Sequence, residues 1–206
     1  MRGFAQGAPS KDVHALATAV DAHYNHLRSL HASFTEHYAG MGQQRTEHGD
    51  LLLGKPGRMR WTYSNGKVFL LDGKSAISYV PGDIEAQRVP AKQLDDLRSP
   101  PRFLLGHTQL EKELNGLHAE GTPDGTVILS GAPRFGSGAD SARLQRVSLR
   151  ILPQTGTITG LELQEIDGAR TSFDLSAQEE NIPLKADDFR FSAPAGVRVV
   201  DGLPPV

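Results

Sequence analysis

The residues of this chain most able to do chemistry are its 8 histidines. His23 and His26 lie three residues apart in a predicted helix, and His31 and His37 share one side of a predicted strand. Neutral imidazole is a common zinc ligand, so the spacing permits a metal site. The support is weak, because no group of carboxylates converges with these histidines in the sequence. We predict that they bind no metal, and we keep a histidine-bound metal enzyme as an alternative.

Three pairs of adjacent acidic residues could in principle supply an acid and a base, namely Asp95-Asp96, Glu179-Glu180 and Asp187-Asp188. Adjacent side chains point apart, so each pair is better interpreted as solvated loop charges than as a catalytic couple. The chain also has no Gly-x-Ser-x-Gly motif, phosphate loop or dinucleotide fingerprint. We therefore predict a protein that is not an enzyme and that needs no cofactor.

Length and composition restrict the class of protein further. The 206 residues suffice for one sizeable core, and we expect a single domain over residues 1–206. A formal net charge of -2 gives no basic footprint, so nucleic acid is not an expected partner. No window approaches the roughly 18 consecutive apolar residues of a transmembrane helix, so we expect no membrane span.

The ends and the cysteine content leave the cellular compartment open. There are 0 cysteines, which excludes disulfides and thiolate zinc sites. Residues 1–9 lack the long apolar stretch of a signal peptide, and we expect them to be a disordered remnant. A periplasmic protein that has lost its signal peptide and a cytosolic protein would both begin in this way.

Helical periodicity is strong only near the start. Apolar residues recur at three- and four-residue steps over Ser10–Leu30, which predicts one long helix with Ser10 as its cap. From His31 the period changes to two. Strands are predicted at 31–39, 44–54, 58–64, 67–72, 75–80 and 84–89. Asn65-Gly66 and Asp72-Gly73 favour tight hairpins with type I′ turns, so these strands form an antiparallel meander.

The middle of the chain interrupts the strand pattern. Residues 92–97 and 103–114 are predicted as short helices separated by Ser99-Pro100-Pro101. Strands then resume at 117–122, 126–131, 143–152, 157–166 and 170–177, and the Gly/Ser-rich stretch 132–142 is predicted as a mobile loop. The fold class is therefore mainly β with α: a strongly curved antiparallel sheet of about 11 strands, which could form an incomplete barrel. The N-terminal helix and the short mid-chain helices cover it.

Alternation along the strands predicts an apolar inner side. The pattern is compatible with a packed core and with a ligand cavity, and it does not separate the two. If a cavity exists, its predicted lining is Phe34, Met59, Trp61, Leu70, Tyr79, Leu149, Leu163 and Phe173. The proline-bounded cluster Pro101, Phe103, Leu104 and Leu105 could act as a lid. If it does, a polar replacement of Phe103 or Leu104 should lower the binding of an apolar ligand.

Several short motifs, in their order and spacing, resemble the LolA family of periplasmic lipoprotein carriers. They are Leu30–Glu36, Gly49-Asp50-Leu51 before Lys55-Pro56, Trp61, Asp72-Gly73-Lys74, Tyr79-Val80-Pro81, Ser99-Pro100-Pro101 with Phe103-Leu104-Leu105, and Phe189–Val197. The similarity extends over roughly residues 13 to 202. It implies an unclosed β-barrel with a helical lid around a hydrophobic cavity.

The resemblance also implies a function and partners. A family member binds the acyl chains of lipoproteins, receives them from an inner-membrane ABC transporter and passes them to an outer-membrane acceptor. By this resemblance the chain is a chaperone in the periplasm, and we expect a monomer. The family has an arginine that fastens the lid where this chain has Lys55, so the latch could involve Lys55 or Arg58. The aromatic residues that the family has near Leu52 and Ser78 are absent.

Two alternatives within the same fold stay open. One is a LolB-like outer-membrane acceptor, although such a protein should carry an N-terminal cysteine for lipid attachment. The other is a carrier of a different amphiphilic lipid. The sequence does not say which lipoproteins are carried or whether the cavity is open at rest.

Overall fold

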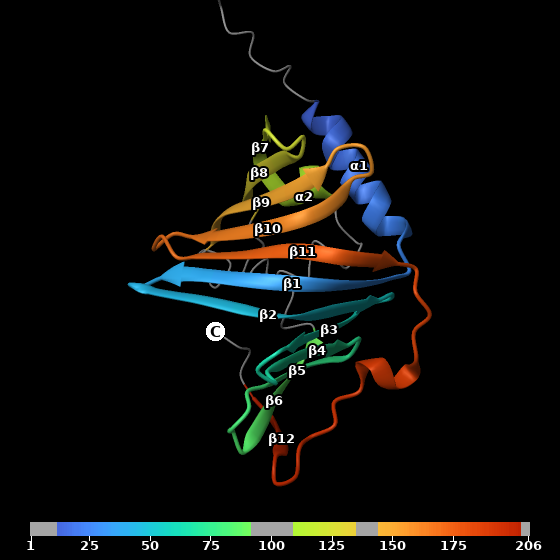
Figure 1. Ribbon diagram of the computed structural model, residues 1–206, viewed down its shortest axis with the longest axis vertical. Coiled ribbons are helices and arrows are strands. Elements are labelled where there is room, and N and C mark those ends of the chain that lie inside the picture. The colour runs from blue at the N-terminus through green and yellow to red at the C-terminus, as the bar shows by residue number, and fades with distance from the viewer. Residues whose placement is uncertain (1–11, 92–108, 135–143, 203–206) are drawn as a thin grey trace, which may run out of the picture.

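The computed structural model describes residues 12–91, 109–134 and 144–202. They form one strongly bent sheet with strand order β12-β6-β5-β4-β3-β2-β1-β11-β10-β9-β8-β7. The two edge strands, β12 and β7, do not pair with each other, so the barrel is unclosed, as predicted. Figure 1 shows the strands stacked from β7 at the top to β12 at the bottom, with helix α1 beside the upper half.

The helices are α1 (Val13–His26), α2 (Leu110–Glu113) and the 3₁₀ helix η4 (Ala186–Phe189). The strands are β1 (Ser29–Gly40), β2 (Gln43–Gly54), β3 (Arg58–Tyr63), β4 (Val68–Asp72), β5 (Ser75–Tyr79), β6 (Glu85–Pro90), β7 (Leu114–Gly121), β8 (Val127–Pro133), β9 (Leu144–Leu152), β10 (Thr157–Glu165), β11 (Arg170–Glu180) and β12 (Arg198–Asp201). All neighbouring strands are antiparallel except β12, which pairs in parallel with β6.

Helix α1 is shorter than the predicted Ser10–Leu30. Asp12 caps it, because the Asp12 carboxylate accepts the backbone N–H of His14 at 3.0 Å. Ser10, the predicted cap, lies outside the described residues. At the other end Ser29 already pairs with Gly54 in the β1–β2 ladder. The apolar residues Leu27 and Leu30 fit both the helical and the strand period, which is why the periodicity extended the helix too far.

The hairpins occur where Asn65-Gly66 and Asp72-Gly73 predicted them, but the turns are not of type I′. Only the glycines have positive φ, 88° at Gly66 and 96° at Gly73, whereas a type I′ turn needs it at both central residues. The Asn65 and Asp72 side chains instead accept the backbone N–H groups of Lys67 and Lys74, at 3.0 and 2.8 Å. These local hydrogen bonds close the turns without a left-handed non-glycine residue.

The sheet has two buried faces. We call the face against which α1 packs the inner face, and the opposite one the outer face. Buried residues of α1, of α2 and of the eleven strands β1 to β11 form a single cluster on the inner face. On the outer face a smaller cluster forms where the segment after β11 crosses β3–β5, with Phe189 against Leu70 and Ile77. Figure 1 shows this segment running down beside the sheet to η4 and returning to β12.

Bulges bend the long strands. The β1–β11 register shifts between His31 and Ser33, close to Ala177, whose φ is 47°. A second shift interrupts β9–β10 between Ile158 and Gly160. Because an extra residue increases local twist and bending, these shifts account for the curvature that brings both halves of the sheet around the inner face.

Five predictions fall partly or wholly outside the described residues. The predicted helix 92–97 and the lid residues Pro101, Phe103, Leu104 and Leu105 lie outside them, as does the expected N-terminal remnant. Of the predicted helix 103–114 only Leu110–Glu113 is described as α-helix. The predicted loop 132–142 begins too early, because β8 continues to Pro133.

Candidate functional site

The inner face carries an aromatic cluster at its centre, which we define as Phe34, Trp61, Tyr63 and Phe173. The Phe34 ring meets Trp61 edge-on at 4.6 Å between centroids and Tyr63 at 4.9 Å. Trp61 and Phe173 are 5.1 Å apart, which joins β3 to β11 across β1 and β2. The Trp61 Nε1–H donates to the sulfur of Met59, so the indole has a partner within this apolar surface.

Six of the predicted lining residues lie together on the inner face. Phe34, Met59, Trp61, Leu149, Leu163 and Phe173 all belong to its buried cluster, and each is at most 7% exposed. They come from β1, β3, β9, β10 and β11, strands that are far apart in the sequence. The structure thus brings them onto one surface, and their contact with acyl chains stays a prediction.

Leu70 and Tyr79 were assigned to the wrong face. In the β3–β4 ladder Met59 pairs with Leu71 and Trp61 with Phe69, so Phe69 and Leu71 point inward and Leu70 points outward. Leu70 pairs in turn with Ile77, and both belong to the outer cluster. Tyr79 shares that face and packs 6.0 Å from the Phe191 ring. In β4 four consecutive residues are apolar, so alternation could not show which of them faces inward.

The inner face also contains a charged group that the sequence analysis missed. We call Glu36, Arg45, Glu47 and Lys67 the polar row. Glu36 lies two residues after Phe34 and opposite Glu47, so β1 and β2 both place a carboxylate on the apolar side. The period of two carries the signal, because Glu36 has the same parity along β1 as Phe34.

Hydrogen bonds satisfy the carboxylates of the polar row. The hydroxyl of Tyr63 donates to Glu36 Oε2 at 2.6 Å, and Arg45 approaches Glu36 Oε1 at 3.5 Å. Glu47 Oε2 accepts from Arg45 at 2.8 Å and from Lys67 at 2.7 Å. Asn65 donates to the other oxygen of Glu47, and the Lys67 ammonium lies 3.7 Å from the centre of the Tyr63 ring.

Titration in this row follows from burial and partners. Burial raises the pKa of Glu47, but the hydrogen bond and charge of Lys67, together with Asn65 and Arg45, outweigh it and hold the pKa below its usual value. Burial and the hydrogen bond to Glu36 raise the pKa of Tyr63, so its hydroxyl stays protonated as a donor. At neutral pH Glu47 therefore stays ionised beside Lys67 and Arg45.

The predicted latch residues do not converge on one face. The Lys55 ammonium donates to the backbone carbonyls of Tyr24 and Asn25, the latter at 2.9 Å, in the last turn of α1. Arg58 points outward, with its guanidinium 4.8 Å above the Phe189 ring. The segment that they were predicted to fasten lies outside the described residues, so a lid latch stays a prediction for both.

Helix α1 is fixed to the sheet at two further points. The backbone N–H of Ile158 donates to the Tyr24 hydroxyl at 3.0 Å, which ties α1 to β10. Asp21 accepts the backbone N–H of Leu110 at 3.1 Å and so connects α1 to α2. Together with Lys55, these bonds hold the helix against the inner face.

A shallow hollow lies on the inner face between β4, β5 and β6. It is lined by Phe69, Ala76, Ser78, Gln87 and Val89. It is too narrow to hold a ligand as it stands.

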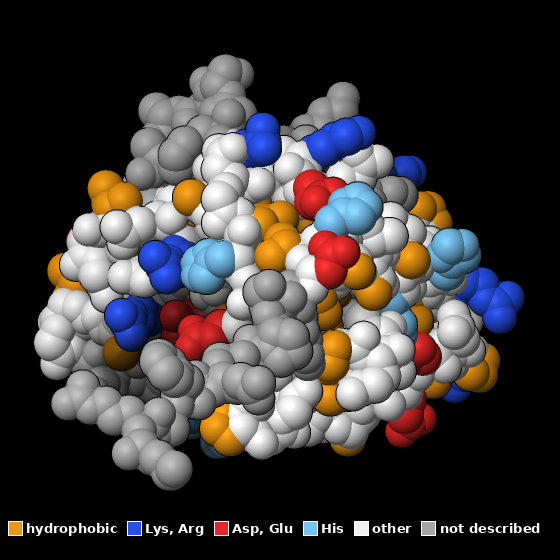
Figure 2. Space-filling model, turned by 90° about the horizontal axis from the view of Figure 1, so that it is seen from above, with side chains coloured by type: hydrophobic (Ala, Val, Ile, Leu, Met, Phe, Trp, Pro, Cys, Tyr) orange, Lys and Arg blue, Asp and Glu red, His pale blue; other side chains and the backbone are white. Residues whose placement is uncertain are grey.

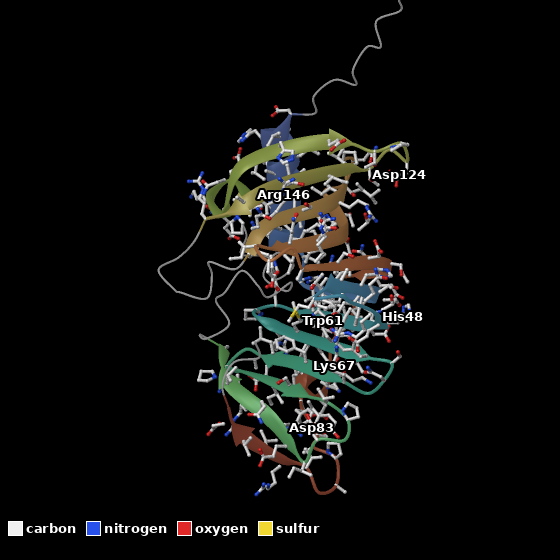
Figure 3. All side chains as sticks on the ribbon, turned by 90° about the vertical axis from the view of Figure 1, so that its left-hand side faces the viewer. His48, Trp61, Lys67, Asp83, Asp124 and Arg146 are labelled. Atoms are coloured by element: carbon white, nitrogen blue, oxygen red, sulfur yellow. The ribbon has the colours of Figure 1, made fainter. Side chains whose placement is uncertain are left out.

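The outer face around β1 and β2 is polar. His31 lies 3.4 Å from Asp50, His48 bonds to Thr35, and His37 lies 3.7 Å from Asp174. Figure 3, which faces the hairpin ends of these strands, shows the labelled His48 and Trp61 apart across the sheet. Over residues 12–91, 109–134 and 144–202, no three histidine or acidic side chains are grouped so that they could hold a metal ion.

The surface near α1 and β7 mixes charges of both signs. Figure 2 shows lysine, arginine, acidic and histidine side chains between small hydrophobic areas, with no large field of one sign on the face that it presents. No helix within the described ranges is long and apolar enough to cross a membrane.

The fold and the inner face together define a class: unclosed β-barrels with an apolar interior surface. The family model described as "Outer membrane lipoprotein carrier protein LolA" matches residues 25–192. The chain therefore belongs to the LolA family of lipoprotein carriers, as the motifs indicated. The outer-membrane lipoprotein carrier protein of Cupriavidus taiwanensis is 28% identical to it over 205 residues, covering 96% of this chain and 92% of that one.

Solved structures show the same fold at low identity. An uncharacterised conserved protein from Thermus thermophilus superposes with a TM-score of 0.57 at 12% identity, covering 92% of this chain and 98% of that one. A putative outer membrane lipoprotein-sorting protein domain from Vibrio parahaemolyticus has a TM-score of 0.52 at 13% identity, covering 87% of this chain and 96% of that one.

Proposed function

We propose that this chain is a periplasmic carrier that binds the acyl chains of lipoproteins on its inner face. As a monomer it takes them from an inner-membrane ABC transporter and passes them to an outer-membrane acceptor. The observation that carries the proposal is the continuous apolar inner face, which five widely separated strands build around the aromatic cluster. Membership of a lipoprotein-carrier family supports it.

The energetics agree with this role. Burying one methylene contributes about 0.8 kcal/mol, so an acyl chain of about sixteen carbons represents roughly 12 kcal/mol of transfer from water. Such a chain does not leave a membrane unaided at a useful rate. A carrier must offer a comparable apolar contact and still release its cargo. An unclosed sheet with a broad apolar face can provide contact without the tight fit that would prevent release.

Two matched substitutions test the proposal. Phe173 on the inner face and Phe189 on the outer face are both 5% exposed, so Phe173→Ala and Phe189→Ala remove the same buried ring from opposite sides. Each variant would be purified from the periplasm of a host that makes lipoproteins, and the bound acylated lipoprotein would be quantified by mass spectrometry. We expect Phe173→Ala to reduce it severalfold relative to Phe189→Ala.

Circular dichroism would first establish that both variants are folded. Equal amounts of bound lipoprotein in the two folded variants would contradict the proposal that acyl chains bind on the inner face. Wild-type protein without any acylated cargo would contradict the carrier function itself.

A further inference from the structure

On β1, β2 and β3 the apolar surface of the inner face ends at the polar row. Across these strands, successive inward rows are Leu30, Leu53 and Met59, then Ala32, Leu51 and Trp61, then Phe34, Gly49 and Tyr63. The next row contains Glu36 and Glu47. With a rise of about 3.3 Å per residue, Leu30 and Glu36 are roughly 20 Å apart along β1. On these three strands the apolar surface is therefore bounded at one end by charges, whereas on β10 and β11 it continues, with Phe173 opposite Glu36 and Leu163 one row further along.

Glu36 is not a solvated surface carboxylate. The residue is only 6% exposed, and both of its oxygens have partners, Tyr63 and Arg45. Glu47 is likewise bonded through both oxygens, to Lys67, Arg45 and Asn65. A group whose charges and hydrogen bonds are already paired has little left to offer a polar ligand. Its position and pairing suit a boundary better than a recognition site.

Contact between an acyl chain and this row would be unfavourable. It would have to displace water from the Arg45 side chain, which is 56% exposed, or separate the paired charges. Taking charged groups out of water without new partners is costly. The aromatic cluster reinforces the barrier, because a Cβ at Gly49 would lie only 2.8 Å from Phe34 Cζ, so the Phe34 ring fills that space.

We propose that Glu36, Arg45, Glu47 and Lys67 form an end wall that limits how far an acyl chain extends along β1–β3 on the inner face, and so select cargo by acyl-chain length. This inference rests on the proposed function, because it assumes that acyl chains lie on that face. Lys67, labelled in Figure 3, lies in the turn between β3 and β4, at the same ends of the strands as the other residues of the end wall.

The test measures affinity against chain length. Synthetic diacyl lipopeptides with one head group and acyl chains lengthened two carbons at a time would be titrated into the protein. Affinity should rise about fourfold for each methylene buried. For the wild type we expect this rise to stop at a limiting length. In Glu36→Leu/Arg45→Leu, which removes one charge of each sign from the wall, the rise should continue to longer chains.

Two further variants make the result specific. Glu36→Gln keeps an acceptor for Tyr63 while removing the charge, so it should move the limiting length in the same direction. It replaces the double variant in the test if the double variant does not fold. Arg150→Leu/Asp174→Leu removes an outer-face ion pair of 2.9 Å and should leave the limit unchanged.

The outcomes separate this inference from the proposed function. A wild-type profile without a limit, or a limit that stays in place in the folded wall variants, overturns the end wall while acyl-chain binding stands. Absence of binding at every chain length overturns the proposed function, and the end wall with it.

Discussion

Side-chain parity decides what each residue of a strand can do in this protein. Trp61 and Phe69 face inward as a register pair, while Leu70 between Phe69 and Leu71 faces the C-terminal segment. The same parity puts Glu36 two positions beyond Phe34 on the apolar side. A buried carboxylate there persists because Tyr63 and Arg45 satisfy it.

The ion pair of Lys67 and Glu47 gives the fold a defined dependence on pH. Lys67→Met removes the ammonium that lies 2.7 Å from Glu47 and should destabilise the protein by about 1 kcal/mol at neutral pH. Because the folded-state pKa of Glu47 is lowered, its contribution is present above the unfolded pKa of about 4.3 and is lost as pH falls through the folded pKa.

Urea unfolding of both proteins at neutral pH and near pH 3 measures this. The difference between wild type and Lys67→Met should shrink at the acid pH, where Glu47 becomes protonated. Lys74→Met is the control, since Lys74 is exposed and has no ion pair among the described residues. A difference of the same size at both pH values would contradict the assignment.

At the scale of elements, helix α1 depends on Lys55 at its C-terminal end. The last carbonyls of a helix have no partner within it, and a cation there also interacts favourably with the helix dipole. Lys55 meets both needs by donating to the carbonyls of Tyr24 and Asn25. Burial lowers the pKa of the Lys55 ammonium, which reflects its position between β2 and the helix.

Lys55→Met should therefore loosen the last turn of α1 without unfolding the sheet. A loss of about 1 kcal/mol corresponds to roughly fivefold faster hydrogen exchange of the amides in that turn. Lys55→Arg retains donors for the two carbonyls and should keep the exchange near the wild-type rate. Unchanged exchange in Lys55→Met would show that the carbonyls do not depend on this side chain.

Local patterns predicted the elements well, and non-local contacts were where prediction failed. The period of two located the strands, and Asn65-Gly66 and Asp72-Gly73 located two hairpins. Alternation could not show which residues of β4 face inward, because its first four residues are all apolar. The outer cover was also missed. Phe189 and Phe191 reach β3–β5 only because the chain after β11 returns across the sheet.

At the scale of the whole molecule, the two faces of the sheet have different roles. On β3–β5 the outer face is covered by the chain's own C-terminal segment, so Leu70 and Tyr79 serve the fold. The inner face spans the whole bend, and its edge strands β7 and β12 leave the barrel unclosed. Under the proposed function a carrier needs both features. The covered outer face stabilises the fold, and the inner face would provide apolar surface for a ligand that must later be released.

The most direct test of the central claim uses the single tryptophan of the chain. Trp61 lies 4% exposed on the inner face, so acyl chains bound there should come within contact range of the indole. Lipopeptides with brominated acyl chains would be titrated while the fluorescence of Trp61 is recorded. We predict saturable quenching in the wild type, and none in Trp61→Phe/Tyr79→Trp, which moves the indole to the outer face. Equal quenching in both proteins, or none in the wild type at concentrations where the lipopeptide binds, would contradict the claim that acyl chains occupy the inner face.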